Sequence, residues 1–248
     1  MRNLKIILEY DGGSFFGFQR QPGRATVQEV LEDALSRLFN TKVKIGAASG
    51  RTDTGVHALA QVVHAKVSTS MPLEKIRRGL NAILPRTMAV RKAEWAPPGF
   101  HARYGARSKL YEYRIWNAEV RSPLGGERMW HIAQPLDLPR MRKAARDLVG
   151  RRDFRSFCAA ISAHKRTVRH LKKLKIAQKG KVVIFQAEAD GFLHHMVRNI
   201  VGTLVEVGRG KILPSRVRGI LRGRDRRLAG PTAPACGLFL VRVTYGRG

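Results

Sequence analysis

One short segment of the 248-residue sequence combines the residue types that acid–base or nucleophilic chemistry requires. Residues 49–58 read Ser-Gly-Arg-Thr-Asp-Thr-Gly-Val-His-Ala and lie between two predicted strands. They hold one carboxylate, Asp53, and one guanidinium, Arg51, with two Thr hydroxyls between glycines. A carboxylate kept ionised by an arginine can act as a base or a nucleophile. The same composition is typical of a tight turn in which Asp53 caps a backbone N–H group or pairs with Arg51. Spacing alone leaves both interpretations open.

A second segment places two adjacent histidines inside a predicted apolar helix over residues 192–207. His194 and Arg198 are four residues apart and would share one face of that helix, as a solvated polar stripe also would. Adjacent helical residues point about 100° apart, and no Cys or Asp close by in the sequence completes a zinc ligand set with His194 and His195. The sequence therefore predicts no metal site.

The elements that must hold the Asp53 segment can be predicted from apolar periodicity. Alternating apolar residues predict strands, and the Thr26–Glu29 capping box ahead of an apolar stripe predicts a helix. A second helix begins at Pro72. The predicted elements are strand 4–10, helix 27–38, strands 42–47 and 61–67, helix 72–83 and strand 88–95. This β-α-β-β-α-β order is that of a split ferredoxin-like unit.

The same order is expected again after a Pro- and Gly-containing linker at residues 97–99. The predicted elements are strand 109–116, helix 137–149, strands 168–177 and 181–189, helices 192–207 and 214–221, and strand 238–244. We therefore expect an α+β fold made of two tandem ferredoxin-like split β-α-β-β-α-β units. They would share a mainly antiparallel sheet with helices on one face and an RNA-binding cleft on the other. The expected domains are residues 1–105, which carry the Asp53 segment, and the more basic residues 106–248.

The charge of the chain restricts the class of partner. Lys and Arg total 47 against 18 Asp and Glu, for a formal net charge of +29. This excess argues against a small-molecule enzyme without a polyanionic partner. The possible partners are nucleic acid, an acidic membrane surface or a phosphate-rich assembly, of which the charge favours nucleic acid. Residues 165–175 and 216–227 are especially rich in Lys and Arg, as expected for a surface that follows a phosphate backbone.

The remaining composition favours a reduced compartment. The sequence has 2 Cys, too few for a disulfide framework or a four-cysteine zinc site. No apolar run reaches the roughly 18 residues of a membrane span. We expect a cytoplasmic protein that does not bind a membrane.

Six motifs resemble those of the tRNA pseudouridine synthase A family, in the family's order. Gly50-Arg51-Thr52-Asp53-Thr54-Gly55-Val56-His57-Ala58 resembles the catalytic loop of the family. The other five motifs also resemble sequences of the family and are spread over nearly the whole chain. They comprise residues 10–28, 100–113, 153–158, 191–202 and 233–238. Two small departures are Thr54, where the family commonly has Ala, and Phe18, where Trp is common.

The resemblance implies roles for individual residues. Asp53 falls on the catalytic aspartate, Arg51 on the arginine of the catalytic loop and Tyr111 on the tyrosine that packs against the substrate. Arg198 would contact a phosphate or Asp53 in the active-site cleft. The residues expected to bind RNA share a positive or titratable side chain and are Arg20, Arg24, Arg103, Lys109, Lys165, Arg166 and His194.

The resemblance also implies a reaction and a substrate: isomerisation of uridine to pseudouridine at positions 38, 39 and 40 of the tRNA anticodon stem-loop, by a homodimer. The N1–C1′ bond breaks, the base turns and C5 is joined to C1′. No redox or phosphoryl step occurs, so neither metal nor cofactor is expected. Asp53 would act as a nucleophile at C1′ or as a base that removes the 2′ proton. The uridine must first leave the stack.

Two other classes of function compete with this interpretation. A non-catalytic RNA-binding or ribosome-associated protein would account for the charge and the fold, but leaves the Arg51–Asp53 segment unexplained. A metal-dependent nuclease would need clustered carboxylates, whereas the 8 Asp of the chain are scattered.

Overall fold

The computed structural model describes residues 1–159 and 166–246. The chain forms two compact units, Met1–Arg107 with Phe239–Gly248, and Ser108–Leu238. The C-terminal strand, expected in the domain 106–248, is thus part of the first unit. Sequence order alone does not reveal which strand a terminal strand will pair with.

The first unit has the predicted β-α-β-β-α-β order. Its elements are β1 (Arg2–Tyr10), α1 (Val27–Phe39), β2 (Ile45–Ala48), β3 (His57–Val67), α2 (Leu73–Ile83) and β4 (Met88–Ala96), with β10 (Leu238–Tyr245) added at the end of the chain. β1 lies between β3 and β4 and is antiparallel to both, and β2 pairs with β3. β10 is parallel to β3, with Phe239 opposite His57.

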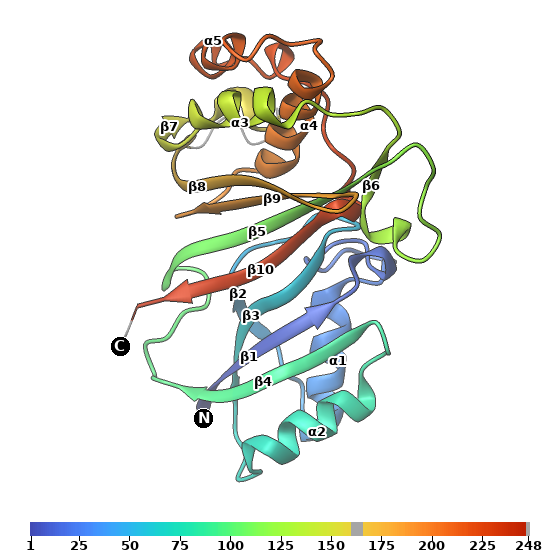
Figure 1. The fold of residues 1–248 in the computed structure, drawn as a ribbon. Coiled ribbons are helices and arrows are strands. Elements are labelled where there is room, and N and C mark those ends of the chain that lie inside the picture. The colour runs from blue at the N-terminus through green and yellow to red at the C-terminus, as the bar shows by residue number, and fades with distance from the viewer. Residues whose placement is uncertain (160–165, 247–248) are drawn as a thin grey trace. The chain divides into compact units, whose positions relative to one another are not determined.

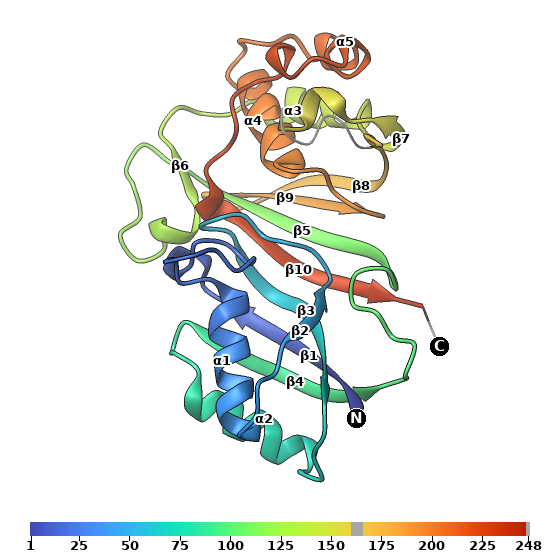
Figure 2. The same ribbon diagram turned by 180° about the vertical axis from the view of Figure 1, so that it is seen from behind.

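Helices α1 and α2 cover one face of this sheet (Figure 2). The capping box predicted for α1 is confirmed, since Thr26 is the N-cap and its hydroxyl accepts the N–H of Glu29 at 3.3 Å. The apolar stripe of α1, with Leu31 and Leu35, is fully buried. Leu4, Ile6 and Leu8 of β1 are fully buried as well, so this strand and this helix both contribute to the close-packed core of the unit.

The second unit is built on an antiparallel sheet in the order β5-β9-β8-β7. Its elements are β5 (Ala106–Asn117), β6 (Trp130–Ile132), α3 (Leu138–Arg146), β7 (Gly150–Asp153), β8 (Val168–Lys179), β9 (Val182–Ala189), α4 (Met196–Gly208) and α5 (Arg216–Gly223). β6 is parallel to β5. The helices of this unit lie on one side of β8 and β9 (Figure 1). The expectation of an α+β fold with mainly antiparallel strands is confirmed.

Some predicted elements differ from the structure. β6 and β7 were not predicted, because three or four residues are too few to show a period. β3 begins at His57 rather than at 61. The helix predicted over 192–207 begins only at Met196, because His195 has a left-handed backbone with φ 62° that interrupts helical geometry.

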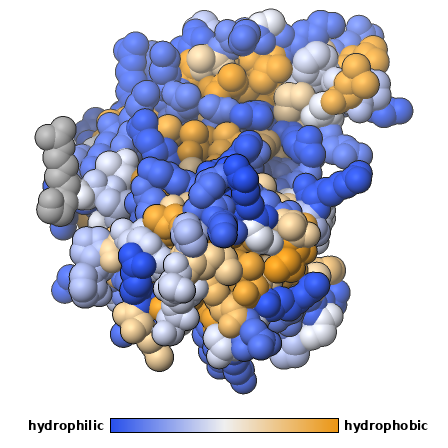
Figure 3. All heavy atoms as spheres, turned by 90° about the horizontal axis from the view of Figure 1, so that it is seen from below, coloured by the Kyte–Doolittle hydropathy of each residue, from blue (hydrophilic) through white to orange (hydrophobic). Residues whose placement is uncertain are grey.

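The surface is rich in charged side chains. The face shown in Figure 3 is mostly hydrophilic, with hydrophobic residues in smaller patches between them. Among the described residues, no helix is long and apolar enough to cross a membrane.

Candidate active site

Asp53 lies in the loop that joins β2 to β3 in the first unit. A short turn closes this loop, because Val56 N–H donates to the Asp53 carbonyl at 3.1 Å and Gly55 has φ 79°. The left-handed conformation at position 55 is one that glycine adopts without strain. The turn leads directly into β3, so Asp53 stands four residues before a strand that is paired on both sides.

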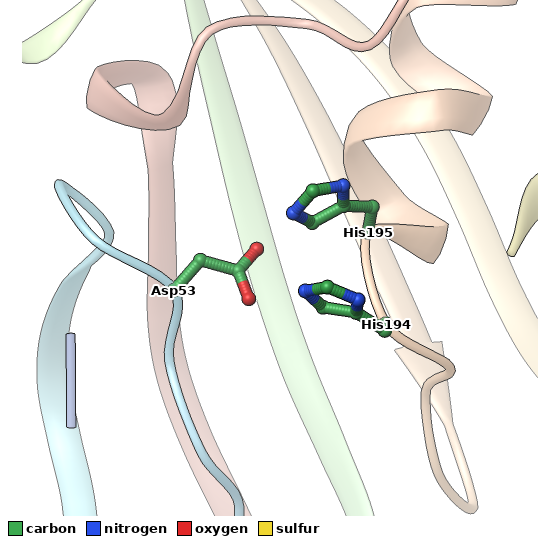
Figure 4. A group of neighbouring side chains, drawn as sticks. All are labelled: Asp53, His194 and His195. Carbon is green, nitrogen blue, oxygen red and sulfur yellow. The ribbon is translucent and has the colours of Figure 1, made fainter. Parts of the chain in front are cut away.

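Burial differs from residue to residue along this loop. Arg51 is exposed, Thr52 is only 6% exposed, and Asp53 is half-buried. Figure 4 shows the Asp53 carboxylate extending from the loop. Thr52 is thus the covered residue between two neighbours that solvent reaches.

A buried hydrogen-bond network includes Thr52. The Thr52 and Tyr10 hydroxyls are 2.8 Å apart. Gln61 Nε2 donates to the Gly50 carbonyl at 2.8 Å and to the Tyr10 hydroxyl at 3.4 Å, and Gln61 Oε1 accepts from the Ser49 hydroxyl at 2.6 Å. The network thus joins the start of the loop to the ends of β1 and β3. It was not predicted; the one available signal was a polar residue, Gln61, at a buried strand position.

Tyr10 stays a neutral phenol at physiological pH. Its burial raises the pKa of the hydroxyl to about 12, against the lowering effect of the bonds to Thr52 and Gln61. Its hydrogen bonds are therefore constant across the range in which Asp and His residues titrate.

The segment that follows β1 packs under the same loop. Phe18 N–H donates to the Thr52 carbonyl at 3.0 Å. A Cβ at position 12 would lie 2.1 Å from the Val56 carbonyl oxygen, so only glycine fits there. Two of the motifs that resemble the family, residues 10–28 and the Asp53 loop, are therefore in direct contact in the structure.

His57 closes the other end of the loop. Gly12 N–H donates to His57 Nδ1 at 3.1 Å, and Asp11 Oδ1 lies 3.0 Å from the same nitrogen. The imidazole is buried and stacks on Phe239, with ring centroids 4.7 Å apart. This contact links β1, β3 and β10 at the base of the loop.

Tyr111 and Arg198 belong to the second unit. Tyr111 is 7% exposed in β5, and its ring meets the edge of Phe192 at a centroid distance of 5.0 Å. Arg198, on α4, donates from Nε to the Ala233 carbonyl at 2.8 Å, and Ala233 N–H donates back to the Arg198 carbonyl at 3.1 Å. Both are held firmly within their unit.

The expected helical arrangement of His194 and His195 is wrong. Both precede α4, and Figure 4 shows their rings side by side. The ring centroids are 4.0 Å apart. His194 therefore does not share a helix face with Arg198. The angular argument against joint metal binding depended on helical geometry and does not apply to these two residues.

The predicted RNA contacts have different surroundings. Arg20 lies 3.5 to 3.8 Å from Glu29, Glu32 and Asp33, so acidic neighbours offset its charge. Two arginines lie over aromatic rings, Arg24 over Phe16 at 4.5 Å and Arg103 over Tyr104 at 5.7 Å.

The remaining predicted contacts lie in the second unit. Lys109 is half-buried in β5, and Arg166 and His194 are exposed. Lys165 lies outside the described residues.

Known proteins resemble the chain over almost its full length. A sequence model described as tRNA pseudouridine synthase matches residues 6–105 and 144–246. Proteins named tRNA pseudouridine synthase A from Pelobacter propionicus, Geotalea uraniireducens and Geobacter sulfurreducens are each 46% identical over 245 residues, which cover 99% of this chain and 100% of each relative. A chain of a solved Cbf5-Nop10-Gar1 complex has a TM-score of 0.38 and 14% identity, over 96% of this chain and 48% of its own length. On the sequence matches, this chain belongs to the tRNA pseudouridine synthase family.

Proposed function

We propose that this protein isomerises uridine to pseudouridine in tRNA, at positions 38, 39 and 40 of the anticodon stem-loop. Family membership supports the reaction and the class of substrate. The observation that carries the assignment to this site is the loop of residues 49–56. In this loop Thr52 is buried and bonded to Tyr10, while Arg51 is exposed and Asp53 is half-buried.

In the proposed reaction Asp53 supplies the one ionisable group that the chemistry needs. The N1–C1′ bond of uridine breaks and a C5–C1′ bond forms, while the C5 proton passes to solvent and N1 gains a proton. Asp53 either adds to C1′ and is later displaced, or removes the 2′ proton and returns it. Both routes regenerate the carboxylate, and neither consumes a cofactor.

The other proposed roles concern the tRNA. The target uridine leaves the stack, Tyr111 packs against the flipped uracil, and Arg51 keeps Asp53 ionised and fills the space that the base vacated. Arg198 contacts a phosphate or Asp53. The residues proposed to bind the backbone are Arg20, Arg24, Arg103, Lys109, Lys165, Arg166 and His194. We further propose a cytoplasmic homodimer.

Release of tritium from [5-³H]uracil-labelled tRNA tests the proposal, because C5 loses its hydrogen when it joins C1′. We expect the wild type to release tritium at an unchanged rate with excess chelator, and Asp53→Asn to be slower by about a thousandfold or more. Asp147→Asn, the same change at the end of α3, is the matched control and should stay within about twofold.

Each result has a distinct meaning. Wild type that binds tRNA and releases no tritium would refute the enzyme and favour the non-catalytic RNA-binding alternative. Release that survives Asp53→Asn would refute only the assignment of Asp53, and loss of activity with the chelator would refute the metal-free reaction.

A further inference from the structure

The Tyr10 hydroxyl is a buried hydrogen-bonding group beside the Asp53 loop. Tyr10 is the last residue of β1 and is 3% exposed, and its hydroxyl meets a residue 42 positions later in the chain, Thr52, at 2.8 Å. Gln61, which is fully buried, contacts the same hydroxyl from β3 at 3.4 Å. Three elements thus converge on one oxygen atom.

Two buried side chains bond this oxygen. Gln61 Nε2 can only donate, so it occupies one lone pair of the Tyr10 oxygen. The Tyr10 and Thr52 hydroxyls are 2.8 Å apart, and either of them can donate to the other. Burial of all three groups makes this bond costly to break without a replacement partner.

Thr52 transmits this constraint to its neighbours through the backbone. Burial of residues 51 to 53 runs exposed, buried and half-buried, so Thr52 is the covered residue of the three. While its hydroxyl stays bonded to Tyr10, the backbone of Thr52 is held in place, and Asp53 is attached to that backbone. Gln61 holds the chain two residues earlier, through the Gly50 carbonyl.

We propose that Tyr10 is a positioning residue for Asp53, acting through its hydrogen bond to Thr52; this inference rests on the proposed function. Tyr10 is almost completely buried, so it acts through its neighbours and not as a catalytic residue. Its contribution is to hold the direction of the carboxylate during the chemical step, where a displacement of about 1 Å can cost a hundredfold in rate.

Tyr10→Phe tests the proposal, because it removes the hydroxyl and keeps the ring. We expect the single-turnover rate at saturating tRNA to fall about tenfold, because Thr52 loses the bond that holds it and Asp53 is then less well positioned. The tRNA dissociation constant should change by less than about twofold. The matched control is Tyr245→Phe, which removes a phenol hydroxyl that donates to the Ala102 carbonyl at 2.7 Å in the same unit. We expect this control to keep the wild-type single-turnover rate.

Variants of Thr52 test whether Tyr10 acts through its hydrogen bond to Thr52. Thr52→Val keeps the shape and removes the hydroxyl, so it should slow the reaction as much as Tyr10→Phe does. Thr52→Ser restores the hydroxyl and should return the rate to within about twofold of wild type. The double variant Tyr10→Phe/Thr52→Val should be no slower than either single variant, because both remove the same bond.

The outcomes separate the positioning role from simple stabilisation and from failure of the proposed function. A wild-type rate for Tyr10→Phe, or an equal loss in Tyr245→Phe at the same melting temperature, would overturn the positioning role while leaving the enzyme intact. Additive losses in the double variant would overturn the route through Thr52. Inactive wild type would instead refute the proposed function, and the positioning role with it.

Discussion

Thr52, between Arg51 and Asp53, is buried and bonded to the Tyr10 hydroxyl at 2.8 Å. Buried polar residues thus hold the backbone of the segment to which the proposed catalytic side chains are attached. His57 anchors the other end of the loop, since its ring bonds the backbone of Gly12 and stacks on Phe239. At the scale of single residues, a buried polar layer lies beneath the exposed Arg51 and the half-buried Asp53.

His64 makes the stability of the first unit depend on pH. Burial in β3 and the positive charges of His101 and Lys66 lower the pKa of its imidazole below the ordinary 6.5. The unfolded chain therefore binds the proton more tightly than the folded chain does. The contribution of neutral His64 to stability is fully present above about pH 6.5 and is lost as the pH falls toward the pKa of the folded state. We predict that the free energy of unfolding decreases between pH 7.5 and 5.5.

Denaturant titrations at several pH values would measure this slope. His64→Gln should flatten it, whereas His170→Gln, at an exposed position of β8, should leave it unchanged. An equal slope in wild type and His64→Gln would assign the pH dependence to other groups.

At the scale of elements, helix α4 illustrates how close packing restricts a sequence. A Cβ at Gly202 would lie 1.8 Å from the Pro231 carbonyl oxygen, and the next residue, Thr203, accepts the Gly230 N–H at 2.9 Å. The backbone of residues 230–233 therefore lies directly on α4. Glycine is required here for close approach, although it is a poor helix former.

Gly202→Ala should lower the free energy of unfolding by about 2–3 kcal/mol, because backbone atoms must move apart. Gly219→Ala, in the exposed part of α5 where no atom lies within 4 Å of the added Cβ, should raise it by about 0.5–1 kcal/mol. Urea unfolding of the two variants measures both values. Equal effects of the same sign would show that helix propensity, and not contact with residue 231, governs both sites.

At the scale of the whole molecule, a net charge of +29 predicts that tRNA affinity falls steeply with salt. Arg166→Ala should weaken tRNA binding about threefold to tenfold and reduce the slope of log K against log salt by about 1, if Arg166 contacts a phosphate. Arg77→Ala removes the same charge from α2, where Glu74 already binds the guanidinium at 2.6 and 3.0 Å. This control should leave both quantities nearly unchanged.

Filter binding over a range of KCl concentrations would supply the affinities and slopes. Equal losses in Arg166→Ala and Arg77→Ala would mean that total charge, and not its position, sets the affinity. No loss in either would remove Arg166 from the proposed tRNA contacts.

Local signals were sufficient for most elements. The capping box at Thr26 and the stripe through Leu31 and Leu35 predicted α1 almost to the residue, because caps and periodicity involve neighbours within four positions. The predicted start of α4 was wrong because His195 adopts a left-handed backbone, which its residue type does not predict. β6 and β7 were too short to produce a period.

The sequence by itself determined the β-α-β-β-α-β order of the first unit, the positive charge and the motifs that carry the family resemblance. Only the tertiary structure decided that β10 pairs with β3, that Tyr10 meets Thr52 and that Gly12 lies against Val56. The physical reason is the separation along the sequence of the residues that interact. Secondary structure depends on contacts a few residues apart, whereas these pairs are 42 to about 180 residues apart and form only when apolar faces of separate elements are buried together.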